Sequence, residues 1–78
     1  MIYVATFHTH FGAMTMQRKL KKAGAAAQMM PVPRSLSASC GVCVRFEADS
    51  PETARGAEDL EAVYLEENGG HRLLFQGD

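Results

Sequence analysis

Glycine and proline divide this chain into short segments, and that division restricts its fold more than any other feature. Gly24 follows a stretch with helical periodicity and is a natural helix end. Pro31 and Pro33 end the next run, because proline cannot continue a central strand. Gly41 precedes a run with period two, and Gly69-Gly70 precedes the last run. We therefore expect a domain built from short helices and strands.

The N-terminal half predicts a strand, a helix and a second strand. Residues 2–7 are a short β-rich run, which we take as the first strand. A helix is predicted from Thr9 or His10 to about Ala23. Residues 26–30 form the second predicted strand. The inner stripe of the helix is set by spacings of three and four residues and comprises Ala13, Met16, Leu20 and Ala23.

The C-terminal half predicts a strand, a helix and a final strand. In residues 41–47, apolar side chains at every second position indicate a third strand. The sequence Ser50-Pro51-Glu52 has a capping hydroxyl, a proline and an acid, which is typical of a helix start. That helix is predicted to run to about Asn68, with Ala57, Leu60 and Tyr64 on one face, and residues 71–75 form the last strand.

This order of elements favours an α+β fold, the ferredoxin-like β-α-β-β-α-β sandwich. We expect one domain over residues 1–78, with a four-stranded antiparallel sheet in the order 4-1-3-2 and two helices on one face. The first strand would then end where the third and fourth begin. The prediction therefore gathers His8, His10, Cys40 and His71 at one edge of the sheet, capped by the loop 31–39.

Composition excludes several classes of protein. The net charge is −1, so there is no basic field to bind nucleic acid. No apolar run approaches the roughly 20 residues that span a bilayer, and the N-terminus lacks the pattern of a signal peptide. We therefore expect a cytoplasmic protein that binds no membrane and keeps its cysteines reduced. A core of 78 residues is small, so a homodimer that buries more surface is also an expectation.

Cys40 is the candidate reactive residue. It follows a proline-stiffened loop that carries Arg34, and the predicted fold places it near the start of the first helix. A positive charge and a helix N-terminus both stabilise a thiolate. His10 or His8 would accept the proton. The alternative is a small buried residue at the start of a strand.

Cys43 leaves two alternatives open. Its spacing from Cys40 is that of a redox dithiol. In an extended strand, however, residues three apart are about 10 Å apart at Cα, and a disulfide needs less than about 7 Å. Cys43 would then pack on the sheet, unless the chain curls before the strand begins. The cysteines and histidines include zinc ligand types but follow no standard zinc spacing, so we expect no metal and no cofactor.

The loop and the strand after it carry a family resemblance. The run from Pro31 to Gly41, followed by an aliphatic strand ending in Arg45-Phe46, resembles a family of small proteins described as selenium/sulfur carrier-like. The resemblance covers nearly the whole chain. It implies a small α+β fold and a role in carrying sulfur or selenium on the cysteine. The motif positions are Pro31, Pro33, Arg34, Ser37, Cys40 and Gly41. Cys43 departs from the pattern, because such proteins have a small or aliphatic residue there.

These observations lead to one main hypothesis and two alternatives. The chain would be a carrier or relay that holds sulfane sulfur or selenium on Cys40, between a donor and an acceptor protein, rather than a stand-alone enzyme. Arg34 would stabilise the thiolate or a bound anion, and Gly41 would allow close approach of the acceptor. The alternatives are a non-catalytic module that binds a small anion or a protein, and a Cys40–Cys43 dithiol redox protein.

Overall fold

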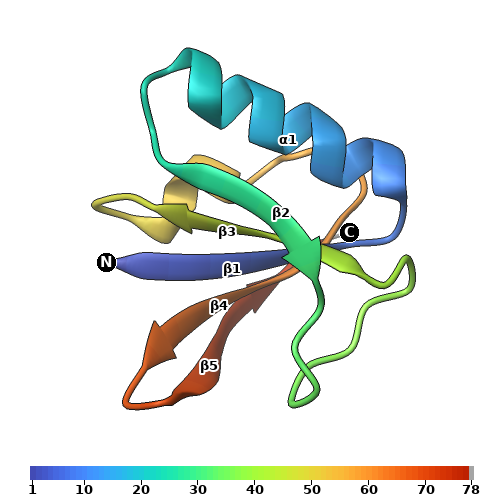
Figure 1. Ribbon diagram of the computed structural model, residues 1–78, viewed down its shortest axis with the longest axis vertical. Coiled ribbons are helices and arrows are strands. Elements are labelled where there is room, and N and C mark those ends of the chain that lie inside the picture. Colours follow the sequence, from blue (N-terminus) through green and yellow to red (C-terminus); the bar gives the residue numbers. More distant parts are fainter. Residues whose placement is uncertain (78) are drawn as a thin grey trace.

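Strand β1 (Ile2–Phe7) lies in the middle of a five-stranded antiparallel sheet in the computed structural model, which describes residues 1–77 (Figure 1). The order across the sheet is β2-β3-β1-β4-β5. The other four strands are β2 (Ala27–Pro31), β3 (Val42–Glu47), β4 (Leu60–Glu67) and β5 (Gly70–Gln76). Every residue of β1 from Tyr3 onward is buried, so this strand lies at the centre of the hydrophobic core.

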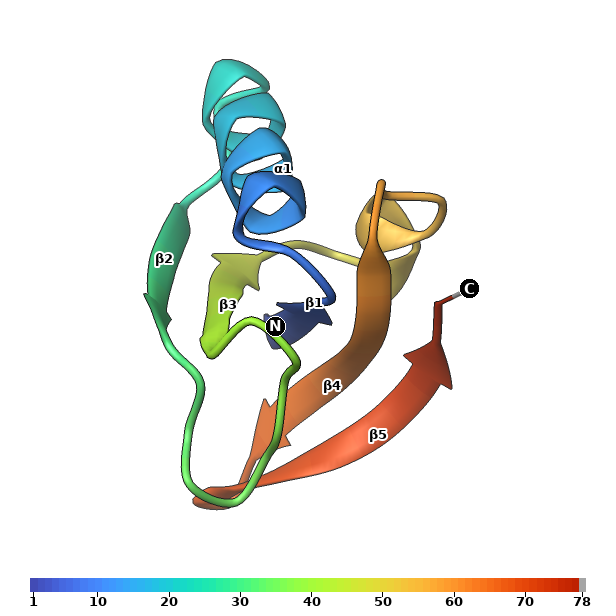
Figure 2. The ribbon, with the colours of Figure 1, turned by 90° about the vertical axis from the view of Figure 1, so that its right-hand side faces the viewer.

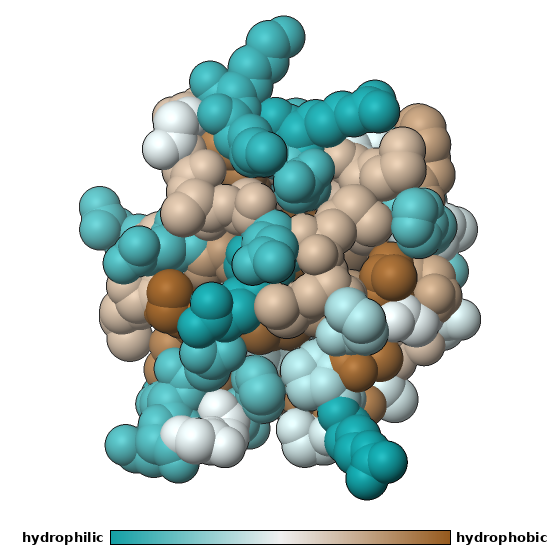
Figure 3. All heavy atoms as spheres, viewed as in Figure 1, coloured by the Kyte–Doolittle hydropathy of each residue, from teal (hydrophilic) through white to brown (hydrophobic). Residues whose placement is uncertain are grey.

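A single helix, α1 (His10–Lys22), packs on one face of the sheet (Figure 1). Thr9 caps it, because its hydroxyl accepts the backbone N–H of Gly12 at 3.0 Å. The buried residues of α1 are Gly12, Ala13, Met16 and Leu20. They meet side chains of β1, β3 and β4, which include Phe7, Phe46 and Val63. On the outer side, hydrophilic side chains project above α1 in Figure 3, where the basic residues from Arg18 to Lys22 are exposed.

The first turn of α1 packs closely on the chain that leads into β4. A side-chain carbon at Gly12 would lie 2.7 Å from the backbone oxygen of Glu58 and 2.9 Å from Cβ of Asp59. Both distances are shorter than van der Waals contact, so only glycine fits here. The start of α1 and residues 58–59 are therefore joined without intervening side chains.

The other face of the sheet is buried without a helix. Val4, Thr6, Cys43 and Ala62 belong to this face, and each is at most 3% exposed. Figures 1 and 2 show the loop 32–41 and the curled β4–β5 hairpin on this side of the sheet. The curl and the loop together take the place of a second covering layer.

The predicted second helix is wrong. Ser50 does cap a turn, since its hydroxyl accepts the backbone N–H of Glu52 at 3.1 Å. The turn is only a short 3-10 helix, η1 (Pro51–Ala54). Gly56 and Asp59 then have φ of 82° and 60°, and this left-handed backbone cannot continue a helix. The chain enters β4 instead.

A β-bulge explains why β4 was mistaken for a helix. Thr6 of β1 pairs with Ala62 and Phe7 pairs with Leu60, so Glu61 is an extra residue in β4. The bulge puts Leu60 and Val63 in the same core cluster although they are three residues apart. Because a regular strand repeats every two residues, this spacing looked like the stripe of a helix.

The segment Asn68-Gly69 is a hairpin turn rather than the end of a helix. Asn68 and Gly69 have φ of 50° and 77°, as a two-residue turn of type I′ requires. The turn joins β4 to β5, which pair in antiparallel fashion. The four-stranded, two-helix ferredoxin-like prediction is therefore wrong, because residues 1–77 form five strands and one α-helix.

Replacing Gly12 by alanine tests the close packing of α1. Alanine favours a helix by about 1 kcal/mol over glycine, whereas forcing a methyl group into a packed site costs about 1–3 kcal/mol. With the Glu58 oxygen only 2.7 Å from the new carbon, we expect the clash to dominate. Urea unfolding should show a lower midpoint for Gly12→Ala.

Gly70→Ala is the matched control. Its nearest atom is the Glu67 backbone oxygen at 3.9 Å, and its φ is not left-handed. We expect this variant to unfold within about 0.5 kcal/mol of the original protein. An unchanged or raised midpoint for Gly12→Ala would show that α1 has room to move away from residues 58–59.

Candidate functional site

Cys40 lies at the end of the loop 32–41, against the last residue of β1. The base of the loop is closed by a hydrogen bond from the Val32 N–H to the Gly41 oxygen at 3.0 Å. Gly41 has φ of 78°, a left-handed turn that favours glycine and returns the chain into β3. The Cys40 Sγ lies 3.2 Å from the Phe7 carbonyl oxygen and 3.6 Å from that of Val42. Cys40 is therefore half-buried, with its S–H directed at backbone oxygens.

These neighbours bear on the chemistry of the sulfur. Both are hydrogen-bond acceptors with partial negative charge, so they pair with the S–H form of the side chain. The sequence predicted Cys40 near the first turn of α1, but the side chain that contacts Thr9 there is Asp59. The Thr9 hydroxyl accepts from Gly12 and donates to Asp59 Oδ2 at 2.7 Å, so these two residues fill the helix N-terminus. In this conformation the Cys40 sulfur faces two backbone carbonyl oxygens.

Glu61 connects the loop to the sheet. Its Oε1 accepts the backbone N–H of Ser39 at 3.1 Å. The same oxygen lies 3.9 Å from Nδ1 of His8, the residue that follows the Phe7 carbonyl. We call His8, Ser39, Cys40 and Glu61 the Cys40 cluster. It brings together one residue after β1, two from the loop and one from the bulge of β4.

The remaining loop residues are placed apart from the sulfur. Arg34 and Ser37 are exposed, and no hydrogen bond or ion pair within residues 1–77 joins Arg34 to Cys40. The Pro33 carbonyl accepts the Leu36 N–H at 3.0 Å, which makes the tip of the loop a tight turn. Pro31 is the last residue of β2. His10 is the first residue of α1 and is exposed.

His71 does not join this end of the sheet, so that part of the predicted gathering is wrong. It pairs with Glu66 in the β4–β5 ladder, at the opposite end of β4 from Leu60. The reason is that a hairpin, not a helix, precedes β5. β5 therefore begins where β4 ends, at the opposite end of the sheet from Cys40. His71 Nε2 lies 3.8 Å from Glu66 Oε1. Two hydrogen bonds from Arg45 to Glu66 raise the pKa of Arg45 and lower that of the Glu66 carboxyl.

Cys43 is a buried packing residue on the other side of β3. Its S–H points to the Pro31 carbonyl oxygen of β2 at 3.8 Å, whereas Cys40 points to β1. Since β3 lies between β2 and β1, the two sulfurs hydrogen-bond to opposite neighbours of one strand. Burial, together with the nearby Cys40, raises the pKa of the Cys43 thiol to about 11. Both cysteines are free thiols.

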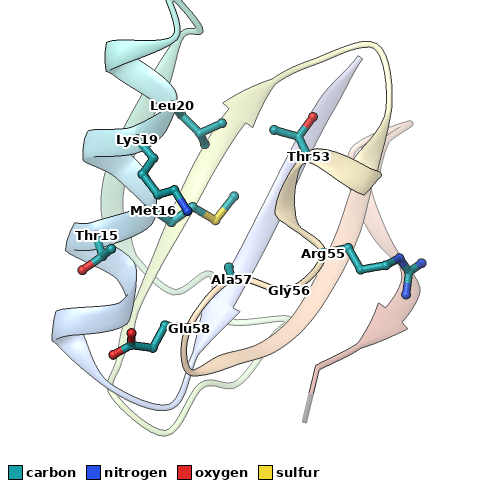
Figure 4. A pocket seen from close by; sticks show the side chains of 9 residues that line it. All are labelled: Thr15, Met16, Lys19, Leu20, Thr53, Arg55, Gly56, Ala57 and Glu58. Atoms are coloured by element: carbon teal, nitrogen blue, oxygen red, sulfur yellow. The ribbon is translucent and has the colours of Figure 1, made fainter.

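Two pockets lie away from the Cys40 cluster. Figure 4 shows a pocket of about 270 Å³ between α1 and residues 53–58. The side chains of Met16 and Leu20 point into it from α1, and Lys19 also lines it. A second pocket of about 420 Å³ lies between residues 55–60 and the end of β5. Neither pocket is lined by a residue of the Cys40 cluster.

Residues 1–77 contain neither a metal-binding cluster nor a helix that could cross a membrane. No cluster of three or more histidine, cysteine, aspartate or glutamate side chains is arranged to hold a metal ion among these residues. Within the same range, no helix has the length and apolar character needed to cross a membrane.

Comparison with known families gives one match. The sequence model of the family described as "Putative Se/S carrier protein-like" matches residues 2–67, which include the whole Cys40 cluster. The chain belongs to this family. No curated protein and no solved structure matches it. The family assignment expected from the loop motif is thereby confirmed.

Sequence reasoning missed three residues at this end of the Se/S carrier-like protein. Glu61 falls inside the predicted second helix, and the sequence gives Thr9 and Asp59 no joint role. The Asp59 conformation and the Glu61 bulge both depend on the pairing of β4 with β1, which no local pattern reveals. A signal was present in Asn68-Gly69, since such a pair between apolar runs favours a hairpin over a helix.

The raised pKa of Cys43 predicts a loss of stability in alkaline solution. The thiol ionises near 9.0 when unfolded and near 11 when folded. The folded protein therefore keeps a proton that the unfolded chain has lost, and the free energy of unfolding falls between these pH values. We expect a decline of no more than about 3 kcal/mol.

Urea unfolding at pH 8 to 11 measures this effect. Cys43→Ala should show a shallower decline than the original protein, and Cys40→Ala should retain most of the decline, because burial is the larger cause of the raised pKa of Cys43. The comparison subtracts the titration of lysine and tyrosine, which all variants share. Equal pH dependence in the original protein and Cys43→Ala would contradict the assignment.

The opposite placement of the two thiols predicts that no disulfide joins them. After equilibration in glutathione buffers and acid quenching, mass spectrometry should detect mixed disulfides on Cys40. An intramolecular disulfide would require β3 to release its pairing near Val42. A reversible Cys40–Cys43 disulfide that forms without loss of the fold would refute this prediction and support the redox alternative.

Proposed function

We propose that this Se/S carrier-like protein holds sulfane sulfur or selenium on Cys40 and passes it to an acceptor protein. The observation that carries the proposal is the separation of its two thiols. Cys43 is fully buried, and its raised pKa keeps it protonated at neutral pH. Cys40 is half-buried at the end of an exposed loop, inside the segment that matches the family. Membership of the family supports the choice of cargo.

The loading step is a thiol–persulfide exchange. The Cys40 thiolate attacks the outer sulfur of a donor persulfide, R–S–SH. A new S–S bond forms, the S–S bond of the donor breaks, and the donor leaves as R–S⁻. The net reaction converts Cys40–SH and R–S–SH into Cys40–S–SH and R–SH, without oxidation or reduction overall. Delivery is the same exchange with an acceptor thiol as the attacking group.

The Cys40 cluster supplies the means to move the proton. The S–H now donates to the Phe7 carbonyl, and the next residue along the chain is His8. The Glu61 carboxylate near Nδ1 would stabilise an imidazolium at His8. We assign His8 the role of taking the Cys40 proton and returning it to the departing R–S⁻. His10, the other candidate, is exposed at the start of α1.

Arg34 and Gly41 have supporting roles in this proposal. Arg34 is exposed on the same loop, where its guanidinium can meet an anionic group on an approaching protein. Gly41 leaves open space beside the loop, since no atom of residues other than its two chain neighbours lies within 4 Å of where its side chain would begin. A thiol of the acceptor can approach the persulfide from that side.

Mass spectrometry tests the proposal directly. The protein is incubated with a small-molecule persulfide, or with a selenium analogue, and then blocked with an alkylating agent. We expect one added sulfur or selenium atom on Cys40 in the original protein and in Cys43→Ala. We expect no adduct in Cys40→Ser, in which a hydroxyl replaces the thiol.

The outcomes separate the carrier from its alternative. If Cys40 is alkylated by reagent yet takes up no sulfur or selenium from several donors, the carrier role is refuted. A partner protein that binds Cys40→Ser as well as the original, but fails to bind Arg34→Ala, would instead indicate a non-catalytic binding module.

A further inference from the structure

We propose that Glu61 is a positioning residue that holds the Cys40 loop closed against β1 and so controls access to the sulfur. This inference deepens the carrier proposal and rests on the role of Cys40 in it. It concerns the regulation of the site rather than its cargo. Three independent features of the structure support it: the bulge, the hydrogen bond to Ser39, and the contacts of the sulfur.

The bulge gives Glu61 its position. In a regular ladder, β4 would have one residue opposite each residue of β1. Here Glu61 is an extra residue between the Leu60–Phe7 pair and the Ala62–Thr6 pair. The neighbours Leu60 and Ala62 are buried, while the Glu61 side chain is 29% exposed and points to the loop. Bulges often redirect one side chain beside a functional site, and this one turns a carboxylate toward Ser39.

The hydrogen bond to Ser39 acts on Cys40 through the backbone. Glu61 Oε1 holds the Ser39 N–H at 3.1 Å, one residue before Cys40. The other end of the segment is fixed by the Gly41–Val32 hydrogen bond at 3.0 Å. Residues 39–41 are therefore joined to other parts of the chain at two points, Ser39 and Gly41, and the Gly41 N–H also donates to the Ala38 oxygen at 3.2 Å within the loop. Between these two points, the Cys40 sulfur faces the Phe7 oxygen. Releasing Ser39 frees one of these two points.

The closed arrangement both shields the sulfur and can be opened. In it, the Cys40 S–H donates to the Phe7 carbonyl oxygen at 3.2 Å, and the Cys40 side chain is half-buried. The Glu61 contact, by contrast, lies at the surface, and the His8 side chain beside it is 44% exposed. Hydrogen bonds open to solvent contribute little net stability. The loop can therefore open locally while β1, β3 and β4 stay paired.

The rate at which iodoacetamide alkylates each cysteine tests the proposal. Peptide mass spectrometry follows Cys40 and Cys43 separately at one pH in four proteins: the original, Glu61→Ala, Glu61→Gln and Glu58→Ala. We expect Cys40 to react roughly three- to ten-fold faster in Glu61→Ala, the factor that one lost hydrogen bond gives. In Glu61→Gln the amide oxygen still accepts from Ser39, so the rate should stay near that of the original protein. Glu58→Ala removes the same charge from an exposed neighbouring position and should change nothing.

Cys43 is the internal control. Its rate should stay constant in all four proteins, because it is buried on the other side of β3. Faster reaction of both cysteines in Glu61→Ala would show general loosening of the fold and overturn the proposal. An unchanged Cys40 rate in Glu61→Ala would also overturn it. Neither result depends on persulfide transfer, so a failure here is distinguishable from a failure of Cys40 to load sulfur or selenium.

Discussion

The antiparallel pairing of β4 with β1 is the contact on which the rest of the structure depends. β1 is buried along its length, and β4 closes the side of it that β3 does not reach. The irregularity in that pairing places Glu61 beside the loop and leaves Asp59 at the start of α1. Without β4 in this register, the carboxylate would not meet Ser39, and the first turn of α1 would lose its acidic partner. The candidate site is thus a product of tertiary pairing rather than of a local motif.

The two cysteines near the start of β3 differ in environment, because Cys40 is half-buried and Cys43 is fully buried. Cys40 and Cys43 are three residues apart, yet their thiols hydrogen-bond toward β1 and β2, the two neighbours of β3. The sharp turn at Gly41 makes this separation possible, because it lets Cys40 leave the strand direction. Burial then gives Cys43 the properties of a small apolar residue, while Cys40 keeps contact with solvent.

Local patterns predicted the first half of the chain well and misread much of the second. β1 and α1 have regular spacing and clear ends at Phe7 and Gly24, and the structure keeps both. β4 contains a bulge, so its apolar residues lose the period of two and acquire the spacing of a helix. The predicted helix then moved His71 to the wrong edge of the sheet. Cys40 was placed correctly at the end of β1, because that placement required only β1 and β3.

The placement of Cys43 has a consequence for damage. An oxidant arriving from solution meets Cys40 first, and the resulting sulfenic acid can be capped by a small thiol and later reduced. Cys43 is buried in β3, between β2 and β1, and its raised pKa keeps the thiol protonated. It is therefore protected from these reactions. Among the two thiols, oxidation is therefore directed to Cys40, in a loop at the surface. A reversible modification of Cys40 thus falls outside the strands, whereas one of Cys43 would fall inside β3.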